Sequence, residues 1–133
     1  MEKTARTGAK ARKPYRFSRK PQSGYAVKGR VWVEKDGELY LGWGRILLLE
    51  NIERLGSISA AAKEMGLGYR NAWLWIDSMN KLSPSPLVEK VTGGAGGGSA
   101  RLTEEAHKAI AYYKELHSEL QDFIRDRETK PDS

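Results

Sequence analysis

Three neighbouring side chains, Tyr69, Arg70 and Asn71, carry groups that readily hydrogen-bond nucleic-acid bases and phosphates. An arginine fork can bond guanine through two donors or hold a phosphate by its charge, and an asparagine amide can pair with adenine. Such residues read bases when they begin a helix that is exposed enough to enter a DNA major groove. The flanking sequence must therefore build a helix of this kind.

The flanking residues have the pattern of two short helices that cross at a tight turn. Ala61 and Ala62 provide small side chains where a second helix can cross the first, and Gly66 can adopt the positive φ that the turn requires. After Leu67, apolar residues recur at helical spacing, at Ala72, Trp75, Ile76 and Met79. The pattern predicts a helix-turn-helix whose second helix covers residues 69–80. Taken alone, it is equally compatible with an ordinary helical hairpin inside a larger core.

The predicted second helix turns residues 69, 70, 73, 74 and 77 outward. Among them, Trp73 allows two interpretations. A tryptophan on this arc can contact thymine methyl groups, or it can pack against neighbouring elements of its own chain. We favour packing, because large aromatic side chains usually bury their surface.

A short strand, a glycine-rich loop and a second short strand follow the helix-turn-helix. The expected strands are Leu87–Val91 and Ala100–Leu102, and the loop carries glycine at positions 93, 94, 96, 97 and 98. This order predicts a winged helix, whose loop can approach a DNA backbone closely. A nucleotide-binding loop is excluded, because a P-loop needs a lysine before Ser99. A dinucleotide fingerprint that starts at Gly94 would need glycine where Ser99 stands.

Six short motifs stand out along the chain: Gly56-Ser57-Ile58-Ser59-x-Ala61-Ala62-Lys63, Gly68-Tyr69-Arg70-x-Ala72-Trp73, Met79-Asn80, Leu87-Val88-Glu89, Thr92-Gly93-Gly94-x-Gly96-Gly97-Gly98 and Leu102-Thr103. Together they resemble the N-terminal domain of the molybdate-responsive transcriptional regulators, the ModE family. The resemblance covers roughly residues 28–120. A looser likeness to LysR-type domains stops at the helix-turn-helix. Gly68 departs from the family, whose members often have serine there, and glycine is a weaker helix cap.

The resemblance implies a transcriptional regulator that binds double-stranded DNA, in the setting of molybdate- or tungstate-related genes. The helix-turn-helix, the wing and the apolar face of the last helix together predict a homodimer on a palindromic operator. The expected DNA contacts are Ser57, Ser59, Tyr69, Arg70, Asn71, Trp73, Lys90, Thr92, Gly93, Gly94, Gly96, Gly97, Gly98 and Arg101. Family regulators typically carry C-terminal oxyanion-binding domains, and this sequence ends some thirty residues past the wing. We therefore do not expect this chain itself to bind molybdate or tungstate. Two alternatives remain: a small oxyanion sensor, and a heterodimer partner that does not bind DNA.

The excess positive charge of the chain lies in its first residues. Residues 1–20 hold eight lysines or arginines against Glu2 alone, a net charge of +7, whereas the other 113 residues hold 15 basic and 16 acidic groups, a net charge of −1. The triplet Arg-Lys-Pro occurs twice. The expected DNA contacts of this basic tail are Arg12, Lys13, Arg16, Arg19 and Lys20. We expect residues 1–24 to be disordered and to bind phosphates without sequence preference; minor-groove reading and a tail without fixed contacts are the alternatives.

Two further elements complete a domain over residues 25–126. Lys28–Leu41 reads as a β-hairpin around Asp36-Gly37, a type I′ turn signal, with Trp32 or Tyr40 as its anchor on the helices. A helix is expected from Trp43 to Leu55, ended by Gly56. The overall prediction is an α+β, mostly α, winged helix-turn-helix with an N-terminal β-hairpin and a long C-terminal helix.

The last predicted helix begins at Thr103 and has a one-sided apolar face. After a complete winged helix, this face suggests a dimer interface, although it can also cover the first helix of its own chain. The expected interface residues are Ile46, Ile110, Tyr113, Leu116, Leu120 and Phe123. Residues 127–133 are charged and expected to fray.

The composition argues against catalysis and metal binding. The sequence has no cysteine, which rules out disulfides and thiolate metal sites and fits a cytoplasmic protein. His107 and His117 lie about 15 Å apart along a helix, too far to share a metal ion. We therefore expect no enzymatic activity, no cofactor and no metal. The longest apolar run is far too short for a membrane span, so we expect no membrane partner.

Overall fold

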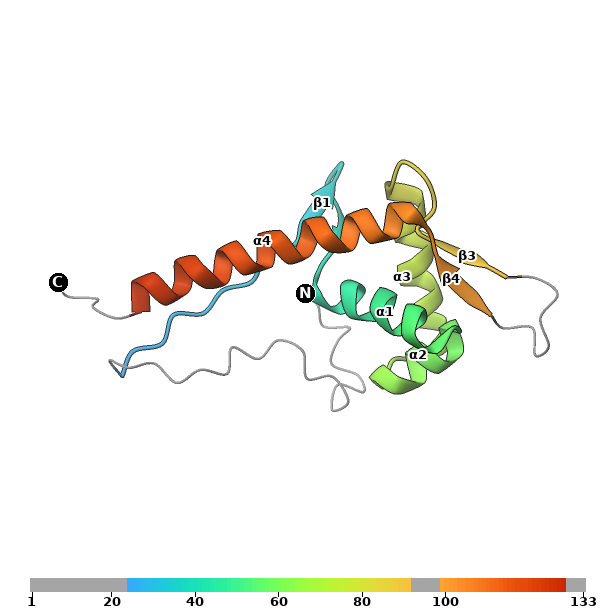
Figure 1. The fold of residues 1–133 in the computed structure, drawn as a ribbon, viewed down its shortest axis with the longest axis horizontal. Helices are drawn as coiled ribbons and strands as arrows, with labels where there is room; N and C mark the ends of the chain where they lie inside the picture. The colour runs from blue at the N-terminus through green and yellow to red at the C-terminus, as the bar shows by residue number, and fades with distance from the viewer. Residues whose placement is uncertain (1–23, 92–98, 129–133) are drawn as a thin grey trace.

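The structure is a computed structural model that describes residues 24–91 and 99–128. Its elements follow one another as two strands, three helices, two strands and a long helix (Figure 1). Their bounds are β1 Val33–Lys35, β2 Glu38–Leu41, α1 Trp43–Leu55, α2 Ile58–Met65, α3 Tyr69–Leu82, β3 Val88–Lys90, β4 Ala100–Leu102 and α4 Glu104–Glu128. This is the predicted α+β winged helix-turn-helix. None of its helices in the described ranges is long and apolar enough to cross a membrane.

The first hairpin forms around the predicted turn. Asp36 and Gly37 both have positive φ, at 53° and 82°, as a type I′ turn requires. Strands β1 and β2 are antiparallel, with a register shift between Val33 and Glu34. Of the two proposed anchors, Tyr40 packs against the core, whereas Trp32 is exposed and donates a hydrogen bond to Glu34.

Helix α1 is the centre of the hydrophobic core. Its residues Ile46, Leu48, Leu49 and Ile52 are fully buried. It ends at Gly56, whose φ of 77° is the left-handed conformation expected of a glycine cap. The Arg45 side chain donates hydrogen bonds to the Leu39 carbonyl at 3.0 Å and to the Ser78 hydroxyl at 3.2 Å. Because these partners lie on β2 and α3, Arg45 holds the hairpin and α3 to α1.

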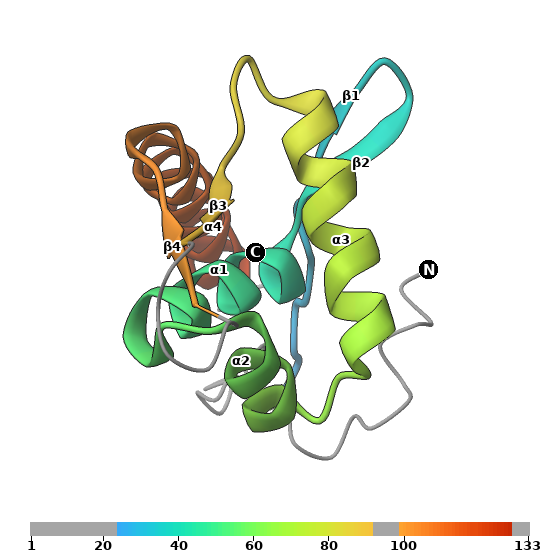
Figure 2. The ribbon, with the colours of Figure 1, turned by 90° about the vertical axis from the view of Figure 1, so that its right-hand side faces the viewer.

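The helix-turn-helix has the geometry that the sequence predicted. Ala61 and Ala62 are buried on α2, which contacts α1 and α3. The turn passes through Gly66 at a φ of 67°, and the Leu67 amide donates to the Ala62 carbonyl at 2.9 Å. Ser57 caps α2, because its hydroxyl accepts from the Ala60 amide at 2.9 Å. Helix α3 ends at Leu82, two residues beyond the predicted end. It follows α2 and runs beside the first hairpin (Figure 2).

Helix α4 packs on α1 at its start and then extends past the rest of the domain (Figure 1). Thr103 caps it as expected, accepting from the Ala106 amide at 3.2 Å. The extended segment that precedes β1 runs beside the later turns of α4. There the Tyr113 hydroxyl donates to the Val31 carbonyl at 2.7 Å, and a β-carbon on Gly29 would lie 3.5 Å from the Ile124 side chain. Part of the apolar face of α4 is therefore covered by its own chain.

Candidate nucleic-acid interface

The outward face of α3 presents the residues that the sequence placed there. Tyr69, Arg70, Leu74 and Asp77 are exposed, and the apolar members are 54% (Tyr69) and 51% (Leu74) accessible. The opposite face buries Ala72, Ile76 and Met79 in the core. Packing therefore fixes one side of α3 and leaves the other free for a partner, as a recognition helix requires.

Trp73 makes packing contacts within the chain. Its ring is half-buried and packs against the core, and the Tyr69 ring meets it edge-on at a centroid distance of 6.4 Å. On the other side, the ammonium group of Lys90 on β3 lies 4.7 Å from the centroid of the Trp73 ring. The Trp73 side chain therefore lies between the rest of α3 and the wing. We define the wing as β3, β4 and the loop that joins them.

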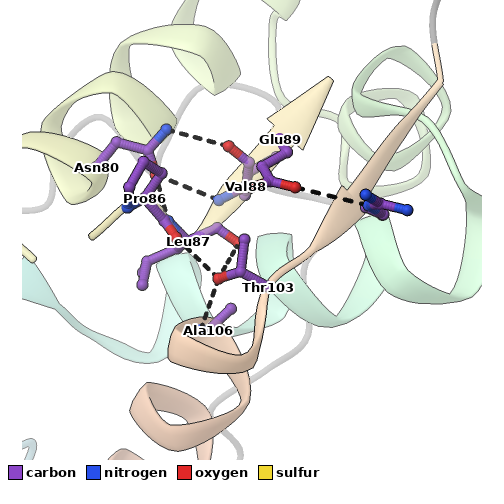
Figure 3. A network of polar contacts seen from close by, with 8 residues as sticks. Asn80, Pro86, Leu87, Val88, Glu89, Thr103 and Ala106 are labelled. Carbon is purple, nitrogen blue, oxygen red and sulfur yellow. Dashed lines mark hydrogen bonds and ion pairs between the residues drawn. The ribbon is translucent and has the colours of Figure 1, made fainter. Parts of the chain in front are cut away.

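Asn80 attaches the first strand of the wing to the end of α3 (Figure 3). Its side-chain oxygen accepts from the amides of Leu87 at 2.8 Å and Val88 at 3.3 Å. Its side-chain nitrogen donates to the Val88 carbonyl at 3.3 Å. The amide thus completes backbone hydrogen bonds that β3 would otherwise lack at this point. Sequence reasoning assigned Asn80 no role beyond its place in a family motif.

Thr103 holds the other side of the wing. Its hydroxyl donates to the Pro86 carbonyl at 2.8 Å while it caps α4 (Figure 3). Strand β4 is also tied to the start of the helix-turn-helix, because the Ala100 amide donates to the Gly56 carbonyl at 3.0 Å. The base of the wing is consequently held by α3, α4 and the α1–α2 connection together.

The charges on this surface are of both signs. Arg101 on β4 pairs with Glu89 on β3 at 3.6 Å, and Lys81 pairs with Asp77 on α3 at 3.4 Å. All four side chains are well exposed, so these pairs contribute little to stability and can exchange partners. Arg70 and Lys90 also carry positive charge on this surface.

The remaining predicted DNA contacts divide into three groups. Ser57 is half-buried and used as a helix cap, whereas Ser59 is exposed on α2. Asn71 is half-buried, so it is less accessible than Arg70. The third group lies outside the described residues: Thr92, Gly93, Gly94, Gly96, Gly97 and Gly98 of the wing, and Arg12, Lys13, Arg16, Arg19 and Lys20 of the basic tail.

Two of the predicted dimer contacts need correction. Ile46 and Tyr113 are fully buried in the core of the chain itself, so they cannot meet a partner in this conformation. Both side chains face inward because α1 and α4 pack together there. Ile110, Leu116 and Leu120 are half-buried, and Phe123 is 53% exposed.

An outer apolar row on α4 adds Tyr112, which the sequence analysis missed, to the predicted contacts Leu116 and Phe123. Tyr112 is 54% exposed and shares one helical face with Leu116 and Phe123, at spacings of four and seven residues. The row lies beside the inner row that the chain itself covers. The helical spacing of Tyr112 from Leu116 and Phe123 can be seen in the sequence. Because the inner row has the same period, the two rows could not be told apart there.

Titratable groups with shifted pKa values lie away from this surface. Burial lowers the pKa of His117, whose ring packs at a tilt against the Trp43 ring with centroids 4.4 Å apart. Burial also raises the pKa of Tyr40, with a smaller effect from the charge of Glu105. Within the described residues, no group of three or more His, Asp or Glu side chains is placed to hold a metal ion.

Comparison with known proteins places this surface in context. No protein-family model matches the chain. It is 46% identical over 92 residues to the molybdenum transport protein ModE of Azotobacter vinelandii, covering 69% of this chain and 34% of that relative. It is 43% identical over 91 residues to the DNA-binding transcriptional dual regulator ModE of Escherichia coli K12, covering 65% of this chain and 34% of the relative. The molybdenum-pterin-binding protein MopA of Rhodobacter capsulatus is 42% identical over 88 residues, covering 66% of this chain and 33% of MopA.

These matches confirm the resemblance that the motifs indicated. The chain spans about a third of the length of the curated relatives it matches, 34% for the first of them. Over that shared segment the chain is similar to regulators of the ModE family, as expected of a ModE N-terminal domain.

Proposed function

We propose that this chain binds double-stranded DNA in a sequence-specific way and regulates transcription. The observation that carries the proposal is the exposed outer face of α3 beside a wing that is anchored to it. In this arrangement α3 enters a major groove, where Arg70 bonds a guanine edge or a phosphate. Lys90 and Arg101 on the wing strands contact the backbone. The basic tail adds phosphate contacts that do not depend on sequence.

The relatives support this proposal and suggest its biological setting. The Escherichia coli relative is named as a DNA-binding transcriptional dual regulator, and others are named for molybdenum. We infer that the operators of this chain belong to molybdate- or tungstate-related genes. The relatives are named as regulators, transport or binding proteins, and we propose a binding function without catalysis for this chain.

We further propose that the chain acts as a homodimer. Tyr112, Leu116 and Phe123 form an apolar row on α4 that the chain leaves partly exposed. Packing this row against its copy in a second subunit buries it, and the two-fold symmetry presents two α3 helices to one face of DNA. The operator is then palindromic, with half-site centres about 34 Å, or a multiple of that distance, apart.

A random-site selection tests this function. The purified chain is incubated with a pool of duplexes at moderate salt, and the bound fraction is amplified and sequenced. Enrichment of an inverted repeat with a fixed spacing is expected. Enrichment of no sequence would refute specific DNA binding and would favour the alternative of a partner that does not bind DNA. Calorimetry with molybdate and tungstate, run in parallel, tests the alternative of a small oxyanion sensor.

A further inference from the structure

Four residues form a stripe along the exposed side of α3: Arg70, Leu74, Asp77 and Lys81. Their spacings of four, three and four residues place them on one helical face. Asp77 and Lys81 are paired with each other at 3.4 Å. Leu74 is therefore the apolar member of an otherwise charged stripe, and half of its surface is open to solvent, at 51%.

An exposed leucine is common on protein surfaces and proves nothing by itself. The position of Leu74 is what gives it meaning, because it follows Arg70 by one helical turn on the side that we propose to face DNA. Trp73, which the sequence analysis considered for apolar contact with a base, is half-buried and packs against the core, and the Lys90 ammonium group lies 4.7 Å from its ring centroid. Leu74 is thus the exposed aliphatic side chain beside Arg70 on this face of α3. Tyr69, which is also exposed, carries a hydroxyl group, and its ring meets the Trp73 ring edge-on.

The chemistry of the major groove limits what a leucine can contact favourably. The base edges there carry hydrogen-bond donors and acceptors, and thymine adds a methyl group at C5. A leucine held against a donor or acceptor removes its water and offers no hydrogen bond in return. Against a thymine methyl group, the same leucine buries apolar surface on both partners.

We propose that Leu74 is a specificity-determining residue that selects one thymine in each half-site through its 5-methyl group. This inference rests on the proposed function and adds to it the identity of one base. Four residues of helix span about 6 Å, and base pairs stack about 3.4 Å apart. The selected thymine therefore lies about two base pairs from the base or phosphate that Arg70 contacts.

Deoxyuridine provides the test, because it differs from thymidine only by lacking that methyl group. In the duplex obtained by selection, each thymine of a half-site is replaced in turn by deoxyuridine, and affinity is measured by titration. For the wild type, replacement at one position should lower the affinity about fourfold per half-site, and about fifteenfold when both half-sites are changed, as expected for one buried methyl group. Replacement of the other thymines should change the affinity little.

Three variants link that loss to the side chain. Leu74→Ala should bind the thymine duplex more weakly and should no longer distinguish thymine from deoxyuridine. Leu74→Met, which keeps an apolar side chain, should retain most of the distinction. Leu55→Ala removes an exposed leucine at the end of α1 and should behave like the wild type. Circular dichroism and thermal unfolding check that each variant is folded.

The possible outcomes distinguish failure of this inference from failure of the proposed function on which it rests. If selection finds no preferred sequence, the proposed function fails and this inference fails with it. If a preferred sequence is found but no thymine responds to deoxyuridine, only the role of Leu74 is overturned. The same conclusion follows if Leu74→Ala keeps the full sensitivity to deoxyuridine, because another side chain then reads the methyl group.

Discussion

Lys90 on β3 places its ammonium group 4.7 Å from the centroid of the Trp73 ring on α3. The face of an indole ring is electron-rich and attracts cations, by about 0.5–1 kcal/mol at exposed sites. The contact joins α3 to the wing through two side chains that both lie at the proposed interface. The position of the wing cation is therefore coupled to α3.

Removing Lys90 should change how binding depends on salt. Each phosphate contact contributes about 0.9 to the slope of log affinity against log salt concentration, so Lys90→Ala should lower that slope by about 1.8 in a dimer. Trp73→Leu keeps apolar packing but removes the ring face, and it should produce part of the same loss. The double variant should then lower the salt slope no further than Lys90→Ala alone. Lys108→Ala, which removes an exposed lysine on α4, is the control. If Lys90→Ala and this control have the same salt slope, Lys90 makes no phosphate contact.

Asn80→Ala should destabilise the domain by about 1–3 kcal/mol, because it leaves backbone groups of Leu87 and Val88 without their partner. Denaturant unfolding monitored by circular dichroism measures the loss. Asn51→Ala makes the same chemical change at an exposed hydrogen bond to Arg54 and should cost less than about 0.5 kcal/mol. Equal costs for the two variants would show that Asn80 does not hold the wing.

Phe123→Glu should weaken the dimer, because it places a charge in the apolar row of α4 that we propose to be buried between subunits. Sedimentation equilibrium should show a dimer dissociation constant raised by about tenfold or more, equivalent to about 1.4 kcal/mol. Ser118→Glu adds the same charge on a different face of α4 and should leave the dimer intact. A dimer that resists Phe123→Glu but not Ser118→Glu would place the interface elsewhere.

His117 should make stability depend on pH. Burial lowers its pKa in the folded state below the ordinary value of 6.5, so the unfolded chain takes up a proton more readily. The free energy of unfolding should therefore fall as pH drops through the region below about 6.5. His117→Phe keeps a ring beside Trp43 and should remove this dependence. Thermal unfolding between pH 7.5 and 5.5 tests it, with both proteins carrying His107→Gln so that the second histidine does not contribute.

Features fixed by a few neighbouring residues were predictable from the sequence. The turn at Asp36-Gly37, the glycine caps at Gly56 and Gly66, and the threonine cap at Thr103 follow from local backbone preferences, and the structure has them where expected. Helix positions followed from apolar spacing, because a helix must bury one side.

Features that depend on which distant segments meet were not predictable. The direction of Trp73 depends on the placement of β3, and the role of Asn80 depends on where β3 returns to α3. The burial of Tyr113 depends on its contact with Val31, 82 residues away in sequence. A periodic apolar row shows that a face is buried, but not by which partner, which is why Tyr113 was assigned to a dimer interface.

The central claim is that α3 reads base sequence, and the discrimination between two duplexes tests it most directly. The affinity of the full chain is measured for the selected duplex and for a scrambled duplex of the same composition, at one salt concentration. The wild type should favour the selected duplex by about a thousandfold or more. Arg70→Ala should lose about 1–3 kcal/mol of that preference per half-site if Arg70 bonds a base. Asn71→Ala serves as a comparison that leaves the charge unchanged. Equal affinity of the wild type for both duplexes would contradict the account.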